Sequence, residues 1–543
     1  MSSTIEEKVE AGSNSESKVE SQSSPPSLHK THENPDGLKL DRHGLPLIPQ
    51  PSSDPSDPLN WPMWLKIAIL LQVSFLAGLG PLNQAVINPG AFGMSLGLSV
   101  PPTEFASKPT FRSRRTSTRP QWLPGTYQTT IAIAFAGVGS FLWVPLANTY
   151  GRRPLLLFTT LLSAASCLAS GKAQTWNQLI GTRVLNGLGT SSFFTLGAGV
   201  VSDCFFLHER RVPIILRCFW GAKTVCRGRA MGIFTVFLTN SAHVAPIPGG
   251  LLAQYVNYRW CYYLPGVLDM TLFVLMFFCL PETLYQRGSK PVETAHPILR
   301  RMNPLGHRPE GKHLKLADFG RPFQMLMYPS VLLTAFYYGV TFAFASILPS
   351  VTSATLFRLK HHFTTSQTGF ALGFGTLIGS TLGELAGGLV IDRTMRNSRK
   401  KGGEAVPEVR LSGIWPGVIL QPVGLLVWGF CWQYKTHWLG PTFGFAILCF
   451  AIQIVATVLY SYVADCYKPQ MPETAQVYNF TRQIFGMTLG FWSIPMGMKI
   501  GFQFMGLTLA LVGLVLFLPV VYLMYHGKAM RERLGQPKFN QSL

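Results

Sequence analysis

The chain has 543 residues, a formal net charge of +21, 47% hydrophobic residues and only 13% charged residues. Soluble domains carry about 25% charged residues, so this composition excludes a large water-soluble enzyme and a chain that is disordered throughout. An excess of Lys and Arg in so apolar a chain is typical of a multi-pass membrane protein with basic cytoplasmic loops rather than of a nucleic-acid-binding protein. The nine cysteines form no C-x-x-C pair, so we expect neither a disulfide framework nor a metal site.

Residues 1–60 form a polar segment that is rich in Ser and Pro. Ten acidic and five basic residues give the segment a charge of −5. Such a composition predicts a disordered cytoplasmic tail. The segment contains no apolar core of the kind found in signal peptides, so we expect the first membrane span to direct insertion.

Twelve apolar runs follow, each long enough to cross the hydrocarbon core of a bilayer as a helix. The longest interior gap, 282–326, comes after the sixth run. We therefore predict an all-α membrane protein with twelve transmembrane helices in two pseudo-symmetric six-helix halves, 61–281 and 327–525. A cytoplasmic loop (282–326) joins the halves, and a cytoplasmic tail (526–543) follows them. The predicted spans are 64–86, 127–147, 154–171, 178–201, 230–252, 260–281, 327–351, 368–391, 411–432, 439–464, 476–498 and 502–525.

The distribution of Lys and Arg among the loops predicts the orientation of the chain in the membrane. With the N-terminus inside, the inner loops and the C-terminal tail carry 27 of these residues, and the outer loops carry 11. Both termini are therefore expected in the cytoplasm. The first outer loop breaks the pattern, because five of its residues are basic.

The two predicted halves share sequence features at matching positions, which favours an internal repeat. The turn after the second span reads PLANTYGRRP (145–154), and the turn after the eighth reads GGLVIDRTMR (387–396). The fourth span ends in GVVSDCF (199–205), and the tenth ends in SYVADCY (461–467).

Between matching positions, the first half is longer in two places, with 84 residues against 65 and then 78 against 60. Most of each excess lies in a basic segment without acidic residues: FASKPTFRSRRTSTRPQ (105–121) and RVPIILRCFWGAKTVCR (211–227). We hypothesise that both segments are short introns translated in frame. The alternative is genuine loop insertion, which surface loops tolerate at small cost.

Several short motifs together resemble the major facilitator superfamily, and most of all its twelve-span fungal drug:proton antiporters. The resemblance covers about residues 57–525 and implies a membrane transporter. The motifs are DPLNWPMW (57–64), PLANTYGRRP (145–154), RVLNGLG (183–189), APIPGG (245–250), YRWCYYLP (258–265) and LPETLY (280–285).

The family's turn motif, G-x-L-A-D-R-x-G-R-R, is partly matched in each half. In the first half Leu146, Ala147 and the G-R-R end match, but Asn148 replaces the aspartate. Arginines at such helix ends can pair with carboxylates and helix C-termini across the halves and stabilise one access state. The alternative is ordinary positive charge on the inner side. The conformational-latch candidates are Gly151, Arg152, Arg153, Asp392 and Arg393.

Ionisable residues inside predicted spans are functional candidates, because burying them in a bilayer is costly. Arg183 heads an R-x-x-N-G-x-G motif in the fourth span, and the resemblance implies a role in proton coupling. The alternatives are a structural ion pair or a side chain that reaches the membrane surface. Asp269 and Glu384 lie in apolar stretches of the sixth and eighth spans, where a carboxyl can act as a proton carrier. Alternatively, Asp269 accepts structural hydrogen bonds, and Glu384 pairs with the turn near Asp392 and Arg393.

The fifth span contains AHVAPIPGG, which matches the antiporter motif of the family at Pro246, Gly249 and Gly250. The resemblance implies a role in suppressing leak, and the alternative is simple close packing of helices. Thr239 and His243 in the same span share one helical face that could line a cavity. A buried His whose hydrogen bonds are satisfied is the alternative for His243. Proton-coupling candidates are thus Arg183, Asp269, Glu384 and His243.

Polar and aromatic residues gather at positions expected near the middle of the membrane. A cavity of aromatic and amide groups suits amphipathic organic solutes or cations. Many such residues serve instead as hydrogen-bonding contacts between helices. The substrate-cavity candidates are Gln84, Gln128, Thr239, Tyr337, Tyr338 and Asn479.

These observations predict a secondary active transporter that exports drugs or metabolites by alternating access, in exchange for protons. We expect no enzymatic activity, no cofactor and no nucleic acid partner. The expected partners are a small-molecule substrate, protons and the bilayer, and the expected state is a monomer in the plasma membrane rather than the vacuolar membrane. The alternatives are an importer or facilitator of a nutrient or polyamine, and a transporter-like sensor without flux.

Overall fold

The computed structural model describes residues 52, 54, 57–91, 94, 123–205, 227–285, 314–400, 406–467, 469–535 and 537. The chain divides into two units, Met1–Gln50 and Pro51–Leu543, and all of the described residues belong to the second. The suspected insertion 105–121 lies outside the described residues. So does 211–227, apart from the backbone of Arg227 at the start of a helix.

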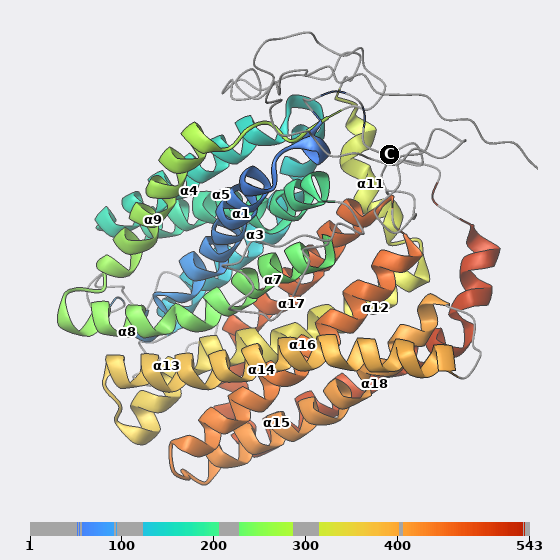
Figure 1. Cartoon of the computed structure of the whole chain (residues 1–543). Coiled ribbons are helices and arrows are strands. Elements are labelled where there is room, and N and C mark those ends of the chain that lie inside the picture. Colours follow the sequence, from blue (N-terminus) through green and yellow to red (C-terminus); the bar gives the residue numbers. More distant parts are fainter. Residues whose placement is uncertain are drawn as a thin grey trace, which may run out of the picture. The chain divides into compact units, whose positions relative to one another are not determined.

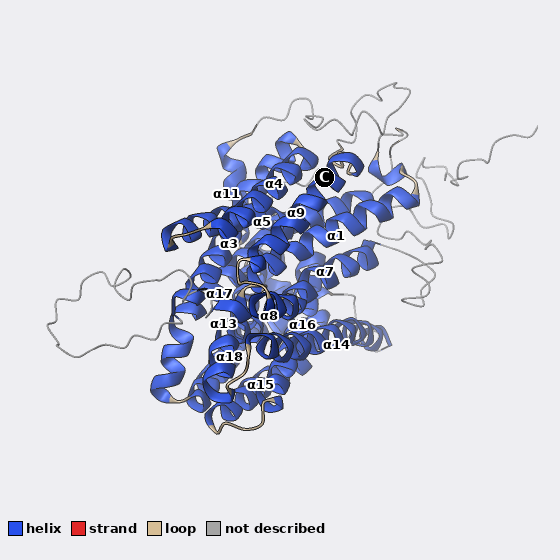
Figure 2. Ribbon diagram, turned by 90° about the vertical axis from the view of Figure 1, so that its left-hand side faces the viewer, coloured by secondary structure: helices blue, strands red, loops and turns tan. Residues whose placement is uncertain are grey.

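The described residues form helices and connecting loops and contain no strand (Figure 2). We call the helices before residue 286 the N-terminal helices and those after residue 313 the C-terminal helices. The N-terminal helices are η1 (Pro58–Asn60), α1 (Met63–Ala85), η2 (Asn88–Gly90), α3 (Leu123–Tyr150), α4 (Arg152–Lys172), α5 (Trp176–Cys204), α7 (Arg227–Val244), α8 (Pro246–Tyr255) and α9 (Trp260–Cys279). The C-terminal helices are α11 (Leu316–Met325), α12 (Pro329–Phe342), the π-helical turn η3 (Ala343–Ile347), α13 (Leu348–His361), α14 (Thr365–Lys400), η4 (Pro407–Ile414), α15 (Trp415–Gln433), α16 (Leu439–Cys466), α17 (Met471–Ile500) and α18 (Phe502–Leu534).

Every predicted span coincides with a helix or with helices that follow one another directly. The fifth span is divided between α7 and α8, which meet at Ala245, and the seventh comprises α12, η3 and α13. Within the described part of the chain, ten helical segments are long and apolar enough to cross a membrane. Neither the α7–α8 pair nor α17 is among those ten. The protein is therefore a multi-pass, all-helical membrane protein.

Packed or helical structure extends into three of the segments that were predicted as tails or a loop. The polar tail was expected to extend to residue 60, but Asp57 is fully buried and its carboxylate accepts a hydrogen bond from the Leu59 amide at 3.0 Å. The ammonium group of Lys66 also donates to the Leu59 carbonyl oxygen at 2.9 Å, so this stretch packs onto α1. The central loop contains the helix α11, and the last helix continues to Leu534 instead of ending at residue 525.

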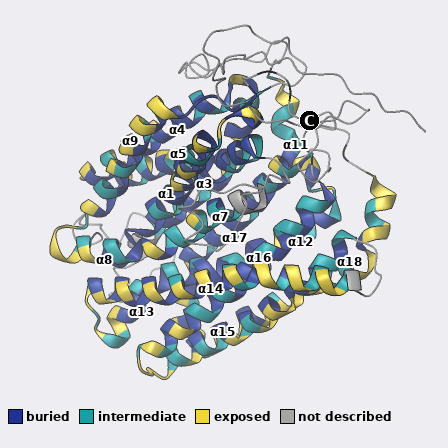
Figure 3. Cartoon of the chain, in the orientation of Figure 1, coloured by how far each residue is buried: buried dark blue, intermediate teal, exposed yellow. Residues whose placement is uncertain are grey.

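Exposed apolar side chains identify the surfaces that face lipid. On α14 they recur every three or four residues, which places them along one side of the helix. In Figure 3, exposed residues accordingly alternate with buried ones along α14. A stripe of this kind would be a liability in water but suits a hydrocarbon environment. Its members are Phe370, Phe374, Ile378, Leu382, Leu385 and Leu389.

The buried apolar residues fall into separate clusters for the two sets of helices. One cluster contains only residues between 325 and 523, and the other two contain only residues between 61 and 280. Figure 1 shows the same division, with the N-terminal helices in blue to green and most C-terminal helices in yellow to red. The sets meet where α3 packs on α17 and where α7 and α8 pack on α14.

Small residues allow α8 and α14 to approach closely. A Cβ atom added to Gly250 would lie 3.1 Å from the Cα of Gly369, and one added to Gly369 would collide with the Pro246 carbonyl oxygen. Backbone therefore touches backbone at this crossing, as in other glycine-mediated helix contacts in membranes.

We predict that Gly369→Ala lowers the thermal stability of the detergent-solubilised protein, because the added methyl group has no space. Overpacking of this kind typically costs about 1–3 kcal/mol. The unfolding temperature, followed by intrinsic fluorescence, measures the effect. Gly388→Ala is the matched control on the same helix, because nothing lies within 4 Å of its added Cβ. Equal unfolding temperatures for the two variants would contradict the close contact.

Candidate functional site

A cavity lies between the N-terminal and C-terminal helices, and side chains of both sets line it. Its volume is about 70 Å³. Ligand pockets for drug-sized molecules measure roughly 300–1,000 Å³. The described conformation is therefore too closed for such a solute, and the two sets must separate to admit one. Residues lining it include Gln84, Asn88, Thr129, Phe194, Thr239, His243, Tyr338, Phe342, Gln453, Arg482 and Gln483.

The predicted cavity residues divide between this lining and other positions. Gln84, Thr239 and Tyr338 line the cavity, as does His243, which was proposed for proton coupling. Tyr337 points elsewhere, because its ring packs against Phe517 with centroids 5.5 Å apart. The remaining two candidates, Gln128 and Asn479, are not in the lining but form hydrogen bonds beside it.

Arg482 on α17 is the arginine of the cavity lining, and it is only 7% exposed. Its Nε donates to the Asn479 side-chain oxygen at 3.1 Å. Its guanidinium carbon lies 5.0 Å from the ring centroids of both Phe194 and Phe342, which come from α5 and α12. Asn479 in turn donates to the Ala136 carbonyl oxygen of α3 at 3.4 Å. Arg482 thus lies where the two sets of helices meet.

Arg183 on α5 is fully buried in a polar network among the N-terminal helices. Its Nε donates to Gln128 Oε1 at 2.8 Å, its Nη1 to Asn186 Oδ1 at 3.3 Å, and its Nη2 to the Asn83 carbonyl oxygen at 3.1 Å. The guanidinium carbon lies 5.0 Å from the centre of the Tyr262 ring. All three guanidinium nitrogens therefore have partners, which is what a fully buried cation requires.

Asp269 on α9 is also fully buried, and its two carboxyl oxygens differ. Oδ2 accepts hydrogen bonds from Ser163 Oγ at 2.6 Å and from Asn83 Nδ2 at 2.9 Å. Oδ1 has no hydrogen-bond partner among the described residues. Arg183 and Asp269 do not form an ion pair, because Ser163 and Asn186 lie between them. Asn186 Nδ2 donates to Ser163 Oγ at 3.3 Å.

Hydrogen bonds continue from this network to the cavity. Gln128, which accepts from Arg183, donates through Nε2 to Thr129 Oγ1 at 2.7 Å. Thr129 Oγ1 donates to Asn88 Oδ1 at 3.3 Å, and Thr129 and Asn88 both line the cavity. The buried carboxyl of Asp269 and the cavity are therefore connected by polar side chains.

Glu384 on α14 is partly buried and lies outside both the cavity lining and this network. Ser380, one turn before it, accepts a hydrogen bond from the cavity residue Gln453 at 2.7 Å. Glu384 itself forms no ion pair or hydrogen bond with a described residue. Glu384 therefore lies one helical turn from a residue that is hydrogen-bonded to the cavity lining.

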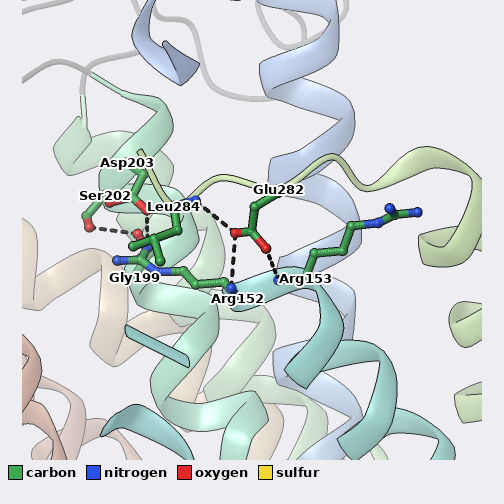
Figure 4. A network of polar contacts seen from close by, with 7 residues as sticks. All are labelled: Arg152, Arg153, Gly199, Ser202, Asp203, Glu282 and Leu284. Atoms are coloured by element: carbon green, nitrogen blue, oxygen red, sulfur yellow. Dashed lines mark hydrogen bonds and ion pairs between the residues drawn. The ribbon is translucent and has the colours of Figure 1, made fainter. Parts of the chain in front are cut away.

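Glu282 organises a second polar site at one end of the N-terminal helices (Figure 4). The side chain is fully buried. Oε1 accepts from the amides of Arg152 at 3.0 Å and Leu284 at 2.9 Å, and Oε2 accepts from the amide of Arg153 at 3.0 Å. The carboxylate therefore caps the N-terminus of α4, where the helix dipole favours negative charge.

The side chains of the two arginines also have partners among the N-terminal helices. Arg152 forms an ion pair with Asp203 at the end of α5. The Nη2 of Arg153 donates to the Phe277 carbonyl oxygen of α9 at 2.6 Å. The contacts seen here thus join α4, α5 and α9, whereas the sequence interpretation had the arginines pairing across the halves.

Gly151, between α3 and α4, has a backbone φ of +109°, which strongly favours glycine. A Cβ atom here would lie 2.6 Å from Glu282 Oε2. The turn therefore needs glycine both for its backbone conformation and for the carboxylate beside it.

Tyr285, three residues after Glu282, ties this site to the segment before α1. Its hydroxyl donates to Asp54 Oδ2 at 3.1 Å and lies 3.1 Å from Ser52 Oγ. Burial is the largest cause of a raised pKa for the Tyr285 hydroxyl, which therefore keeps its proton at neutral pH.

The C-terminal helices carry ion pairs at comparable positions. Arg410 in η4 pairs with Asp465 at the end of α16, with 2.7 Å between Nε and Oδ2. Glu408 accepts two hydrogen bonds from Arg531 at 2.8 and 3.0 Å. The predicted latch residues Asp392 and Arg393 are exposed, and neither forms an ion pair with a described residue.

The antiporter-motif residues lie at helix contacts. Pro246 and Gly250 touch α14 as described above, and a Cβ on Gly249 would collide with the Val86 carbonyl oxygen. The three residues therefore hold α8 against α14 and the end of α1.

Three residues of these sites, Asp203, Glu282 and Arg410, are not among the candidates that the sequence offers, and Arg482 stands out in the sequence only as one of several polar residues in the eleventh span. Asp203 and Asp465 do occupy matching places in the sequence repeat, and this match could have indicated that both form ion pairs at helix ends. Glu282 belongs to LPETLY, so its motif was visible although its role was not. The position of Arg482 inside a predicted span marks it as a candidate, but its orientation toward a cavity depends on the packing of α17 and cannot be read from the sequence.

A bundle of membrane-crossing helices with a polar cavity between two sets of helices is the architecture of a membrane transporter. Comparison with known proteins identifies the family. Residues 73–491 match the model of the Major Facilitator Superfamily. The chain therefore belongs to this superfamily and is a transporter of that kind.

Individual relatives are similar along most of their length. The MFS-type transporter penM of Penicillium rubens is 26% identical over 495 residues, which cover 90% of this chain and 89% of that protein. The efflux pump radE of Floropilus chiversii is 24% identical over 503 residues, which cover 90% of this chain and 85% of that protein. The crystal structure of the human organic anion transporter MFSD10 superimposes with a TM-score of 0.51 at 15% identity, covering 85% of this chain and 100% of that chain. That last likeness concerns the fold alone.

We predict that Glu282→Gln destabilises the protein, because the amide nitrogen that replaces one carboxylate oxygen cannot accept a hydrogen bond from an arginine amide. Leaving a buried donor unsatisfied costs about 1–3 kcal/mol. The midpoint of thermal unfolding in detergent measures the loss. Glu532→Gln is the control, because Glu532 is exposed. A Glu282→Gln protein as stable as this control would mean that the carboxylate does not hold the helix end.

Proposed function

We propose that the protein is a proton-coupled exporter of small organic molecules that works by alternating access between two pseudo-symmetric six-helix halves. The observation that carries the proposal is the chain of hydrogen bonds that connects the buried carboxyl of Asp269 to the cavity between the two sets of helices. Such a connection lets the protonation state of one site influence the binding of a solute at the other.

The two-half arrangement is supported by the separate apolar clusters and by the repeated ion pairs. Arg152 with Asp203 and Arg410 with Asp465 each join the beginning of the third helix of a set to the end of the fourth. In this proposal α7–α8 and α17 are the fifth and eleventh spans. Because α17 carries Gln476, Asn479 and Arg482, its low apolarity follows from its place at the interface of the halves.

The closed side of the transporter is the one on which α8 meets α14. There the Ser366 amide donates to Gln254 Oε1 at 2.8 Å, and η2 packs near α13. With both termini in the cytoplasm, this side is the extracellular one. The network around Glu282 then lies at the cytoplasmic face, where it stabilises the N-terminal half as a rigid unit.

In the proposed cycle Asp269 is the proton carrier and Arg183 is a positioning residue. Oδ1 of Asp269 is the atom available to take up a proton, since Oδ2 already accepts two hydrogen bonds. Arg183 holds Gln128, Asn186 and the α1 backbone in place, so a change at Asp269 can move groups that face the solute. His243 and Glu384 are the second-choice carriers, because His243 lines the cavity and Glu384 lies one turn from Ser380, which is hydrogen-bonded to the lining residue Gln453.

The export direction is supported by the kinship with proteins named efflux pumps. Amide, hydroxyl and aromatic groups in the lining suit organic molecules that are partly apolar. The energy source in this proposal is the proton gradient, and the plasma membrane is the expected location.

We predict that Asp269→Asn abolishes proton-driven transport but leaves solute binding intact. Asn retains an acceptor oxygen for Ser163 and Asn83 but cannot take up a proton. The measurement is the flux of rhodamine 6G and fluorescein in proteoliposomes with an imposed proton gradient, with tryptophan quenching as the binding assay. Glu532→Gln, an exposed carboxyl remote from the cavity, is the control.

The same assay separates the alternatives. A facilitator equilibrates the dye without responding to the gradient, and a sensor binds it without flux. Gradient-driven flux in Asp269→Asn equal to that of the unaltered protein would remove Asp269 from the mechanism. Glu384→Gln and His243→Gln would then be tested in the same way.

We also propose that the segments 105–121 and 211–227 are translated introns and that the functional chain lacks both. The proposal rests on the nearly equal spacing of the halves once both segments are removed. Sequencing the transcript tests it, and the expected message omits both segments. Transcripts that contain them at full abundance would identify both as genuine loops.

A further inference from the structure

Three Lys or Arg residues fall inside the predicted spans: Lys66, Arg183 and Arg482. Lys66 donates to the Leu59 carbonyl oxygen, and each guanidinium nitrogen of Arg183 donates to a partner. Arg482 differs from both, because the hydrogen bond to Asn479 uses Nε alone. Its Nη1 and Nη2 donate to no described residue.

The two free nitrogens face the cavity. Arg482 is one of the lining residues and is more than nine-tenths buried. Neither Nη atom is among the fully enclosed polar atoms that lack a partner, so the small exposed part of the side chain includes this edge of the guanidinium group. The cavity therefore contains a cationic group with two open donors.

No carboxylate balances this charge within the described part of the chain. The described lining residues include neither Asp nor Glu, and Arg482 forms no ion pair. The rings of Phe194 and Phe342 stabilise the cation through their faces. Such contacts return only part of the free energy that a cation loses on burial, so the site is electrostatically incomplete.

The open edge has the geometry for a planar oxyanion. With Nε engaged by Asn479, the Nη1 and Nη2 hydrogens remain as a pair of parallel donors, which matches the two oxygens of a carboxylate. The rest of the lining is mixed: apolar residues such as Ile133, Phe194, Leu238, Phe342, Ile347 and Ile452 lie beside amides, hydroxyl groups and His243. A solute that fits both parts has a carboxylate on an apolar skeleton.

We propose that Arg482 is the anion-binding residue of the transport cavity and that the solutes of this protein are apolar carboxylic acids in their ionised form. The inference rests on the proposed transport function and narrows its substrate class. The carboxylate binds end-on to the Nη edge, and Phe194 and Phe342 hold the guanidinium plane from the two sides of the cavity.

A purely structural role for Arg482 would require its donors to be used within the protein. Arg183 shows what that arrangement looks like in the same molecule, with three nitrogens bonded and no place in the cavity lining. Arg482 lacks those partners, although Gln483 and Tyr338 lie near it in the lining. Its position therefore suits recognition of a solute better than support of the fold.

The test compares two probes that differ only in charge, 2-naphthoate and 2-naphthamide, for binding to the purified full-length protein in detergent. A naphthalene ring needs a more open cavity than the described one, which the solubilised protein can sample. We expect the unaltered protein to prefer the carboxylate. Arg482→Gln should weaken 2-naphthoate binding by about tenfold or more, since a bidentate charged contact is lost, and should leave 2-naphthamide binding unchanged.

Arg482→Lys keeps the positive charge but lacks the two parallel donors of the guanidinium. Its affinity for 2-naphthoate should therefore fall between those of the unaltered protein and Arg482→Gln. Arg396→Gln, an exposed arginine on α14, is the control and should bind both probes normally. Unchanged 2-naphthamide binding and an unchanged unfolding temperature establish that the Arg482 variants are folded. If Arg482→Gln does not fold, the comparison of Arg482→Lys with the unaltered protein decides the question.

Equal affinity for 2-naphthoate in Arg482→Gln and the unaltered protein would overturn the proposal. So would the absence of 2-naphthoate binding, or of a preference for it over the amide, in the unaltered protein. Proteoliposome flux of the same probes keeps this inference separate from the proposed function. Arg482-dependent binding without proton-driven flux would count against proton coupling alone, whereas proton-driven flux of rhodamine 6G without naphthoate binding would count against the anion site alone.

Discussion

A polar group in a membrane-embedded bundle has no bulk water around it and must find its partners among neighbouring helices. This constraint explains the packing of the N-terminal helices. The guanidinium of Arg183 and the carboxyl of Asp269 are both fully buried, yet they do not pair directly. Ser163, Asn186 and Asn83 lie between the two groups and form some of the hydrogen bonds that each group needs. The interior of the helix set is therefore organised around hydrogen-bonded side chains from five helices as much as around apolar packing.

The same constraint distinguishes the two buried arginines. Because the partners of Arg183 all belong to the N-terminal helices, its network can move as one body when the two sets of helices separate. Arg482 instead touches Phe194 from one set and Phe342 from the other. A rearrangement that opens the cavity must change at least one of those contacts. The hydrogen-bonded charge of Arg183 within one set favours rigidity. The charge of Arg482 between the sets, which has free donors, favours a response to a solute.

The apolar runs of the sequence predicted where helices occur, because length and hydropathy are sufficient to identify a membrane-crossing segment. They could not predict which way each side chain faces. Tyr337 and Tyr338 are neighbours on α12, but one packs against Phe517 and the other lines the cavity, since successive residues on a helix point about 100° apart. Polarity likewise singled out Gln128 and Asn479 as cavity candidates, although both serve as supports beside it. Only the rotation of each helix, which depends on tertiary packing, separates these cases.

The two predicted spans that are not among the ten long apolar segments are close to the proposed mechanism. The α7–α8 pair is interrupted before Pro246 and carries Thr239 and His243, and α17 carries Arg482 and Gln483. A helix that lies between two moving sets must offer polar groups to a solute on one side and small residues for close packing on another. Polar groups make α17 less apolar than the other spans, and the break at Ala245 divides the fifth span in two, whereas α14 and α18 retain apolar stripes toward lipid. Under the proposed mechanism, a span that is polar or interrupted in an otherwise regular series is one that contacts the solute.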